Sequence, residues 1–234
     1  MIPDGAVALV AGASGDIGRA IAFDLLRVAA DVIMLGRSLS RLSQAAPPEG
    51  LPGRRHCLAA DLTHDEDIGR VAASPLLRGR LDLLVLSSGA YERSHDRAAF
   101  DQQLAANVTG PYALLRSLLP LLIESKGQVV FVNSSQALKA SAEVGQYAAT
   151  KHALKAVADS LRDEVNPVGV RVMSIYLGRT AGERQRAIFA SEKRPYRPER
   201  LIEPSDIASL VRAMLQLSRT AEVTDVTLRP MQKP

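Results

Sequence analysis

The sequence predicts an α/β protein built on a doubly wound parallel sheet, and two observations carry that prediction. First, short and nearly continuous apolar runs alternate with longer amphipathic stretches along the chain. Such runs are typical of parallel strands covered on both faces, and their alternation with helices indicates β-α-β units. Second, a glycine-rich turn directly follows the first run. We therefore expect a single domain with about seven parallel strands and with helices on both faces of the sheet.

Seven apolar runs are the predicted strands. They are Ala6–Ala11, Val32–Leu35, His56–Ala60, Leu81–Leu86, Val129–Val132, Val170–Leu177 and Val223–Leu228. The stretches between them predict helices, which include Ile17–Ala30, Phe100–Ile123, Tyr147–Val165 and Pro204–Leu217. Pro111 and Pro120 are expected to kink or interrupt the second of these helices. Right-handed crossovers would leave a ligand crevice at the carboxyl ends of the strands.

Length and composition argue against several classes of protein. The 234 residues fit one α/β domain over 1–234, with 47% apolar and 23% charged residues. The net charge of +4 comes without a basic run interleaved with aromatics, so no nucleic-acid partner is expected. The single cysteine, Cys57, suits a reducing compartment. No apolar run reaches the roughly 18 residues of a membrane span, and no secretory leader precedes the glycine turn. We expect a cytoplasmic protein with no membrane partner and no metal site.

The turn after the first predicted strand is suited to a phosphate ligand. Its glycines allow a tight turn and a close approach of the backbone to a ligand. The helix that follows presents free N–H groups and the positive end of its dipole, which favour a pyrophosphate. The predicted cofactor-binding residues of this turn are Gly12, Ser14, Gly15, Asp16, Ile17 and Gly18. The alternative is a glycine-rich turn that binds no ligand.

The end of the second predicted strand favours NADP over NAD. Folds that bind NAD place an acid about 20 residues after the glycines, where it binds the ribose 2′-hydroxyl. This chain has Arg37 and Ser38 there, and Arg41 follows one helical turn later. A guanidinium pairs with a 2′-phosphate, which an acid would repel; alternatively, Arg37 is a solvated loop cation. Asp61, after the third strand, is expected to accept a hydrogen bond from adenine, to cap the next helix, or to do both.

Tyr147 and Lys151 are four residues apart on one predicted helix, so they lie one turn from each other on the same face. A free tyrosine has a pKa of about 10 and is a poor proton donor or acceptor at neutral pH. A nearby ammonium is expected to lower the pKa of Tyr147. Ser134, at the end of the preceding strand, is placed to orient a substrate oxygen. Alone, the Tyr-x-x-x-Lys spacing also fits a half-buried tyrosine beside a surface lysine.

Together these residues resemble the short-chain dehydrogenase/reductase family over about Val7–Arg229. The family's order and spacings are matched by the glycine turn at 12–18, Asp61-Leu62, Gly89, Asn107, Ser134, Tyr147 and Lys151. The resemblance implies a single Rossmann-type domain with a central sheet of seven parallel strands. It implies that Tyr147 is the catalytic acid/base and that Lys151 lowers its pKa and binds the nicotinamide ribose. It also implies that Ser134 polarises the substrate oxygen and that Asn107 holds a water in a proton relay.

The assignment of the serine follows from spacing. In the family the serine and the tyrosine are 13 positions apart, which selects Ser134 over its neighbour Ser135. A shift of one residue along a strand turns the side chain to the other face, so the two are not expected to act together. Ser135 stays the alternative.

The chain also departs from the family's pattern at three places. Asp16 stands where the family has its second glycine, the segment after the fourth strand reads Leu86-Ser87-Ser88-Gly89, and Gly182 replaces a threonine. By resemblance, the further cofactor-binding residues are Asp61, Leu62, Ser88, Gly89, Tyr147, Lys151 and Gly178. Thr180 is expected to bind the carboxamide in place of the missing threonine.

Residues 180–200 fall where the family places its substrate loop. The segment carries Arg184, Arg186, Lys193, Arg194, Arg197 and Arg200. Either it is a lid that attracts an anionic substrate, or it is a solvated and mobile loop. Phe189, Tyr196 and Tyr91 are candidates to line the substrate pocket. By resemblance, the helices Phe100–Ile123 and Tyr147–Val165 pair across a dimer interface, so a homodimer or homotetramer is expected.

We therefore predict an NADP(H)-dependent oxidoreductase that transfers a hydride between nicotinamide and a small carbonyl or alcohol substrate. Reduction of a ketone or aldehyde is the preferred direction, because Arg37 implies the phosphorylated cofactor. One rival is a regulatory protein that binds NADP without turnover and has no use for the four catalytic residues together. Another is a sugar-nucleotide epimerase or dehydratase, whose relatives share the glycine spacing and the Tyr-x-x-x-Lys pair but usually add a C-terminal substrate domain.

Overall fold

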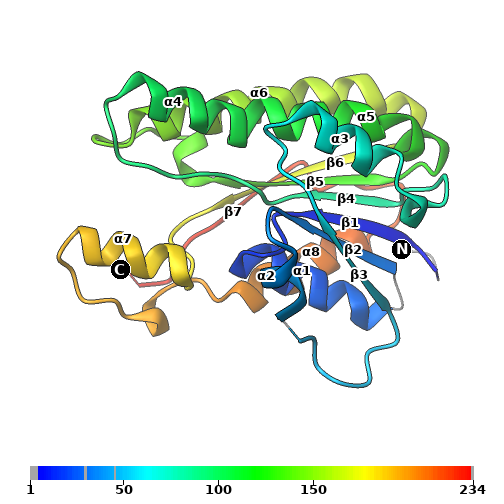
Figure 1. Ribbon diagram of the computed structural model, residues 1–234, viewed down its shortest axis with the longest axis horizontal. Coiled ribbons are helices and arrows are strands. Elements are labelled where there is room, and N and C mark those ends of the chain that lie inside the picture. Colours follow the sequence, from blue (N-terminus) through cyan, green and yellow to red (C-terminus); the bar gives the residue numbers. More distant parts are fainter. Residues whose placement is uncertain (1–4, 29–30, 45, 233–234) are drawn as a thin grey trace.

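A parallel sheet of seven strands forms the centre of the molecule in the computed structural model, which describes residues 5–28, 31–44 and 46–232 (Figure 1). The strands lie in the order β3-β2-β1-β4-β5-β6-β7. Their bounds are β1 (Val7–Ala11), β2 (Asp31–Gly36), β3 (Arg54–Ala59), β4 (Leu83–Leu86), β5 (Gln128–Ser134), β6 (Arg171–Leu177) and β7 (Asp225–Leu228). All neighbouring pairs are parallel, which confirms the predicted sheet.

Helices cover both faces of this sheet, as predicted (Figure 1). The α-helices are α1 (Asp16–Leu25), α2 (Leu39–Gln44), α3 (Asp65–Ala72), α4 (Arg97–Leu104), α5 (Gly110–Glu124), α6 (Gly145–Val165), α7 (Glu183–Ser191) and α8 (Pro204–Leu215). Short 3₁₀ turns cover Leu26–Val28, Pro75–Leu77, Ser135–Ala137, Asn166–Val168 and Pro198–Arg200. In Figure 1, α3 to α6 lie above the sheet, α1, α2 and α8 lie below it, and α7 stands beyond the strand ends. None of the helices in the described residues is long and apolar enough to cross a membrane.

Two apolar clusters hold these three layers together. Along β1, Leu9 faces the cluster under α3, α5 and α6, whereas Val10 faces the cluster over α1 and α8. Leu118 of α5 joins the first cluster and Val211 of α8 joins the second. Every residue of β1 is buried, because both faces of the strand are covered. This is why the strand reads as a continuous apolar run.

The strand ends form a step that opens a cleft. Leu86, the last residue of β4, pairs with Ala11 on one side and with Phe131 on the other. Strands β5 and β6 continue for three more residues, up to the pair Ser134 and Leu177. The strand order also reverses between β1 and β4, which is where ligands bind in doubly wound sheets.

The predicted helix Phe100–Ile123 is divided in the structure. A π-helical turn at Ala105–Thr109 joins α4 to α5, and the N–H of Gly110 bonds to the carbonyl of Ala105. Pro111 has no N–H with which to continue the α-helical pattern, so it accounts for a break at this place. Pro120 lies inside α5 without interrupting it, so the predicted break is at Pro111 alone.

Other predicted boundaries move by a few residues. Helix α1 ends at Leu25 and a 3₁₀ turn follows it, while the predicted end at Ala30 lies outside the described residues. Strand β5 is longer than predicted, because Asn133 and Ser134 continue its pairing with β6. The predicted strands at Leu81 and Val223 begin two residues later, at Leu83 and Asp225.

Glycine at position 110 permits the close approach of α5 to the segment after β3. A Cβ atom there would overlap the carbonyl group of Leu62. By contrast, a Cβ at Gly69, in the exposed face of α3, would meet nothing within 4 Å. The same substitution at these two helical positions should therefore have opposite effects.

We expect Gly110→Ala to lower the free energy of unfolding by about 1–3 kcal/mol, because the backbone of Leu62 must shift. Gly69→Ala is the matched control and should raise it by about 0.5–1 kcal/mol, because alanine restricts the unfolded chain more than glycine does. Urea denaturation of the two variants measures both changes. Equal effects of the two substitutions would contradict this account of the α5 contact.

Candidate active site

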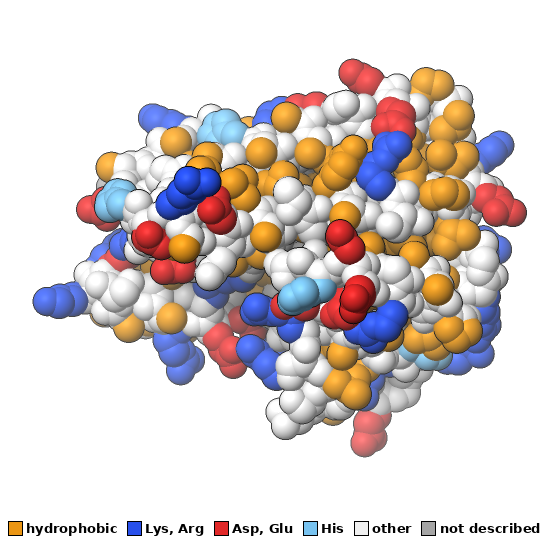
Figure 2. Space-filling model, turned by 45° about the horizontal axis from the view of Figure 1, so that its top comes forward, with side chains coloured by type: hydrophobic (Ala, Val, Ile, Leu, Met, Phe, Trp, Pro, Cys, Tyr) orange, Lys and Arg blue, Asp and Glu red, His pale blue; other side chains and the backbone are white. Residues whose placement is uncertain are grey.

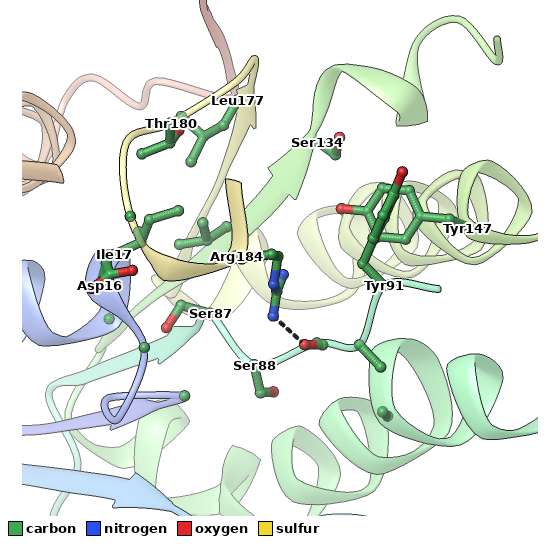
Figure 3. A pocket seen from close by; sticks show the side chains of 18 of the residues that line it. Asp16, Ile17, Ser87, Ser88, Tyr91, Ser134, Tyr147, Leu177, Thr180 and Arg184 are labelled. Carbon is green, nitrogen blue, oxygen red and sulfur yellow. Dashed lines mark hydrogen bonds between the residues drawn. The ribbon is translucent and has the colours of Figure 1, made fainter. Parts of the chain in front are cut away.

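A single cavity of about 680 Å³ lies over the carboxyl ends of the central strands and collects most of the predicted site residues. It runs from the glycine turn after β1 to the Tyr147 end of α6 (Figure 3). Of the predicted catalytic and cofactor-binding residues, Ser38 and Asn107 do not line it. Within the described residues, no group of three or more histidine, cysteine or acidic side chains is placed to hold a metal ion.

The glycine turn is shaped by its contact with the end of β4. Gly12 has a φ of +82°, and a Cβ atom there would lie 2.6 Å from the backbone nitrogen of Ser88. A Cβ at Gly18 would lie 2.5 Å from the carbonyl oxygen of Gly12. Side chains at these positions would push the turn away from the sheet. Gly15 precedes α1, whose first N–H groups have no partner inside the helix and are available to an anion.

Two serines follow the end of β4, where the chain departs from the family's pattern. The hydroxyl of Ser87 donates to the carbonyl of Ala11 at 2.6 Å and so joins the ends of two neighbouring strands. The hydroxyl of Ser88 is buried and has no hydrogen-bond partner within the described residues. A buried hydroxyl without a partner is costly, so Ser88 is suited to bond a ligand in the cavity. This observation and the unpartnered N–H groups of α1 fit a dinucleotide.

Asp16 reaches across the cavity rather than toward the turn. Its carboxylate accepts from the backbone N–H of Glu183 at 2.9 Å and pairs with Arg19 at 2.7 Å. Gly182, directly before Glu183, has a φ of +146°, and a Cβ there would overlap the Asp16 carboxylate. The two departures from the family's pattern, at 16 and 182, therefore meet in one contact.

The predicted 2′-phosphate site lies at the far end of the cavity. Arg37 is exposed and forms no hydrogen bond or ion pair with the described part of the chain, whereas Arg41 pairs with Glu183 at 2.9 Å. The Ser38 hydroxyl accepts from the backbone N–H of Arg41, which places it at the start of α2 and not in the cavity. Arg37 is thus the side chain that a phosphate can engage without breaking an existing pair.

Asp61 lines the cavity after β3. Its carboxylate accepts from the backbone and the hydroxyl of Thr63, so it closes the turn that leads to α3. Burial alone would raise the pKa of Asp61, but the hydrogen bonds from Thr63 and the charge of Arg37 outweigh it and hold the pKa below its usual range. The carboxylate is therefore charged at neutral pH and serves as an acceptor, but it does not cap α3, whose N-cap residue is His64. Its contact with adenine stays a prediction.

Tyr147 stands at the substrate end of the cavity, on the first turn of α6 (Figure 3). Its ring packs edge to face on Tyr91 with the centroids 5.0 Å apart. Burial raises the pKa of Tyr147, while the charge of Arg184 and a hydrogen bond with Ser134 act in the opposite direction. Ser134 is thus beside the phenol as predicted. Ser135 also lines the cavity, but it begins a 3₁₀ turn.

Lys151 is almost fully buried, one turn along α6. Its Nζ lies 5.7 Å from the centroid of the Tyr147 ring. Burial and the nearby charge of Arg184 lower the pKa of Lys151 to about 7. The charge of Arg184 acts on Tyr147 in the direction predicted for Lys151, because it lowers the pKa of the phenol. The role of Lys151 toward Tyr147 stays a prediction.

Asn107 lies behind the cavity and not in it. Its side-chain amide donates to the carbonyl of Ala90 and to the hydroxyl of Thr150, and its oxygen accepts from the N–H of Ala90 at 2.6 Å. The side chain is fully buried and every polar group is used. It holds the segment after β4 against α6. Because the side chain is fully used, only the backbone of Asn107 is available to bind the water of the predicted proton relay.

Asn133 is a site residue that the sequence reasoning missed. Its amide donates to the carbonyl of Lys151 at 3.1 Å, and its oxygen accepts from the N–H of Ser134 at 2.8 Å. It therefore fixes the lysine and the serine together. Its place next to Ser134 in the sequence was a signal for this role. Neighbouring residues of a strand face opposite sides of the sheet. When Ser134 faces the cavity, Asn133 therefore faces the side that α6 covers.

The segment 180–200 is an ordered substructure. Phe189 and Tyr196 pack edge to face with their centroids 5.8 Å apart and form a small apolar cluster with Ala181 and Leu201. The predicted role of Phe189 and Tyr196 as pocket-lining residues is therefore not what the structure has, because they stabilise the segment from within. Tyr91 does line the cavity, as predicted.

Gly178 and Thr180 lie at the end of β6, where the same segment begins. The N–H of Gly178 donates to Leu228, and the hydroxyl of Thr180 donates to Gly178 at 3.2 Å. Both residues line the cavity. A doubly wound sheet with an anion-binding turn at one end of its cleft and a tyrosine, serine and lysine at the other defines an oxidoreductase of the dinucleotide-binding class.

Comparison with known sequences identifies the family. Residues 6–193 match the family model described as short chain dehydrogenase. An uncharacterised oxidoreductase of Staphylococcus epidermidis is 28% identical in an alignment of 231 residues that covers 96% of this chain and 97% of that protein. An uncharacterised NAD-dependent oxidoreductase of Mycobacterium tuberculosis is 32% identical in an alignment of 197 residues that covers 74% of this chain and 70% of that protein. The chain belongs to the short-chain dehydrogenase/reductase family, and the predicted resemblance is confirmed.

Solved structures agree with this assignment over the whole chain. An alcohol dehydrogenase from the archaeon Thermococcus sibiricus, complexed with 5-hydroxy-NADP, has a TM-score of 0.85 at 25% identity and covers 99% of both chains. A metagenomic short-chain oxidoreductase in complex with NADP has a TM-score of 0.82 at 28% identity and covers 98% of this chain and 99% of its own. The protein is thus an oxidoreductase with the single-domain Rossmann-type fold of its family.

Burial of Lys151 predicts a pH-dependent stability. With a pKa of about 7 in the folded state and an ordinary value of 10.5, the unfolded chain holds one proton more between these two values. Stability conferred at this site therefore rises with pH through that window. We expect Lys151→Met to be more stable than the wild type at pH 7, and this gain should shrink toward pH 10. Thermal unfolding from pH 6 to 10 measures it.

The control for this experiment is Lys155→Met, which removes a half-exposed lysine from the same helix. Its difference from the wild type should be small at pH 7, because the Lys155 side chain remains hydrated. A gain of Lys151→Met that stays constant across the pH range would contradict the account of Lys151 as a desolvated group.

Proposed function

We propose that the protein is an NADP(H)-dependent reductase of ketones or aldehydes. The observation that carries this proposal is the continuous cavity that joins the glycine turn to Tyr147, Ser134 and Lys151. A ligand bound by its phosphates at the turn would extend along the cavity toward these three side chains. The substrate is a small molecule, since the cavity is of the size that such ligands occupy.

Each site residue has a separate role in the proposed reaction. A nicotinamide dinucleotide supplies the hydride when bound. Tyr147 gives its phenolic proton to the oxygen of the substrate, and Ser134 donates a hydrogen bond that orients this oxygen. Lys151, with a pKa of about 7, is able to take up and release a proton at neutral pH and so to replace the proton that Tyr147 loses. Asn133 and Asn107 position these groups without touching the substrate.

The choice of NADP rests on charge. Arg37 and Arg41 line the end of the cavity that follows β2, where an acid would select NAD. Two similar solved structures carry NADP or 5-hydroxy-NADP, whereas the Mycobacterium tuberculosis relative is described as NAD-dependent. The two cations favour a 2′-phosphate over a free hydroxyl, so we assign NADP to this chain.

We also propose that the protein is a cytoplasmic homo-oligomer, a dimer or a tetramer. Figure 2 shows hydrophobic side chains among charged ones on the face that carries the layer of α3 to α6. On α5, Tyr112 and Ile123 are exposed. These apolar side chains support an interface through α5 and α6, and the single cysteine supports a reducing compartment.

Tyr147→Phe tests the reaction. It should reduce kcat for a panel of ketones and aldehydes by at least about 100-fold, because general acid catalysis contributes that much. Binding of NADPH, measured by its fluorescence, should change little. Oxidation of NADPH is followed by the loss of absorbance at about 340 nm, where the reduced nicotinamide absorbs.

Tyr91→Phe is the matched control, since Tyr91 lines the same cavity and packs on Tyr147. It should retain most of the wild-type activity. Unchanged turnover by Tyr147→Phe would contradict the role of Tyr147 as the proton donor. Binding of NADPH by a wild type that reduces no carbonyl compound would argue for the regulatory rival.

Arg37→Glu tests the cofactor. The substitution should weaken NADPH binding by about tenfold or more and leave NADH binding nearly unchanged or improved, because a charge-assisted bond to the 2′-phosphate is replaced by repulsion. Dissociation constants of both cofactors are measured by fluorescence titration. Arg97→Glu makes the same charge change at a fully exposed position on α4 and should affect neither cofactor. A wild type that prefers NADH would refute the assignment.

A further inference from the structure

Helix α7 brings an arginine into the centre of the cavity. The guanidinium of Arg184 donates to the carbonyl of Gly89 at 2.6 Å, across the cleft from its own helix. Figure 3 shows the side chain between Asp16 and Ser87 on one side and Tyr91 and Tyr147 on the other. Arg184 is an exposed residue of α7, but its side chain lines the cavity beside the groups assigned to proton transfer.

The charge of Arg184 is not balanced by an acid. Within the described residues it forms no ion pair, and a single main-chain carbonyl uses only part of its five N–H donors. Arg186, two residues along the same helix, instead lies over the ring of Tyr196 at 5.3 Å and does not line the cavity. Two arginines that are two residues apart on α7 therefore serve differently, one in the cavity and one in the segment's own packing.

Two further arginines line the same end of the cavity. Arg93 and Arg179 share one carboxylate, that of Glu192, with Arg179 at 2.7 Å. The Nη1 group of Arg179 is buried and has no hydrogen-bond partner in the described part of the chain. Together with Arg184, three arginines therefore line the substrate end of the cavity, and two of them share the single carboxylate of Glu192.

The acids of the cavity lie elsewhere and are already engaged. Asp16 binds the start of α7, Glu183 pairs with Arg41, and Asp61 accepts from Thr63. The substrate end is therefore positively charged. A negatively charged ligand is the partner that such an end attracts and holds.

The position of Arg184 has a cost that an anion would offset. Its charge acts against protonation of the buried Lys151, which is a like-charge interaction. An anion bound to Arg184 would relieve this repulsion and would satisfy the unused donors in a two-pronged contact. If Arg184 served only to bind the carbonyl of Gly89, its position near Lys151 would bring no benefit.

We propose that Arg184 selects carbonyl substrates that carry a negatively charged group, such as a carboxylate, in addition to the reacting carbonyl. Arg93 and Arg179 add to the field at the same end of the cavity. This inference rests on the proposed function, whose substrate class it narrows. The other anion that Arg184 could meet is a phosphate of the dinucleotide, and the experiment separates the two sources.

The test compares 4-formylbenzoate with its neutral methyl ester in the wild type, in Arg184→Gln and in the control Arg186→Gln. The wild type should reduce the acid with a kcat/KM about tenfold or more above that of the ester, because a charge-assisted hydrogen bond is worth this factor. Arg184→Gln should lose this preference, and Arg186→Gln should keep it. Raising the salt concentration should weaken the preference in the wild type.

Binding measurements make the outcome independent of turnover. Benzoate and benzamide are titrated calorimetrically into each variant, with and without NADPH, and the affinity for NADPH is measured alongside. Tighter binding of benzoate that is lost in Arg184→Gln supports the inference even if no aldehyde is reduced, in which case only the proposed reductase function fails. Equal binding of benzoate and benzamide by the wild type, or a preference that survives in Arg184→Gln, overturns it. So does a variant that loses only its affinity for NADPH, since the dinucleotide is then the anion.

Discussion

The Tyr147 end of the cavity depends on how helix α6 is held over the ends of β4 and β5. Two buried asparagines do this from different elements. Asn133 binds the carbonyl of Lys151 from the end of β5, and Asn107 binds Thr150 from the π-helical turn before α5. A buried polar group without a partner costs about 1–3 kcal/mol, so each bond strongly favours one placement of the helix. The phenol, the serine and the lysine are therefore brought together by groups that need not touch the substrate.

Helix α7 is joined to the cavity by its first two residues. Asp16 binds the N–H of Glu183 from the glycine turn, and Arg184 reaches Gly89 beyond β4. The small cluster around Phe189 gives the segment an interior of its own. Asp16 and Gly182 each depart from the family's pattern. In the structure these two departures meet in one contact. The cofactor turn and the substrate segment are thus coupled mechanically.

Some parts of the site were predictable because they depend on local spacing. Gly12 and Gly18 are required wherever a turn packs this closely on a neighbouring strand, and a tyrosine and a lysine four apart share a helix face in any helix. The electrostatics were not predictable in the same way. A lysine near a tyrosine lowers its pKa only while the lysine is hydrated enough to remain charged, and the burial of Lys151 is a property of the packed layers.

The sequence by itself determined the sheet, the order of its elements, the position of the phosphate turn and the family, because these follow from periodicity and from residues a few positions apart. Tertiary structure decided which side chains face the cavity. Ser38 turned to cap α2, Phe189 and Tyr196 turned into their own cluster, and Arg184 turned inward although Arg186 did not. The physical reason is that the direction of a side chain at an element's end depends on partners from distant parts of the chain. Those partners come together only when the layers pack.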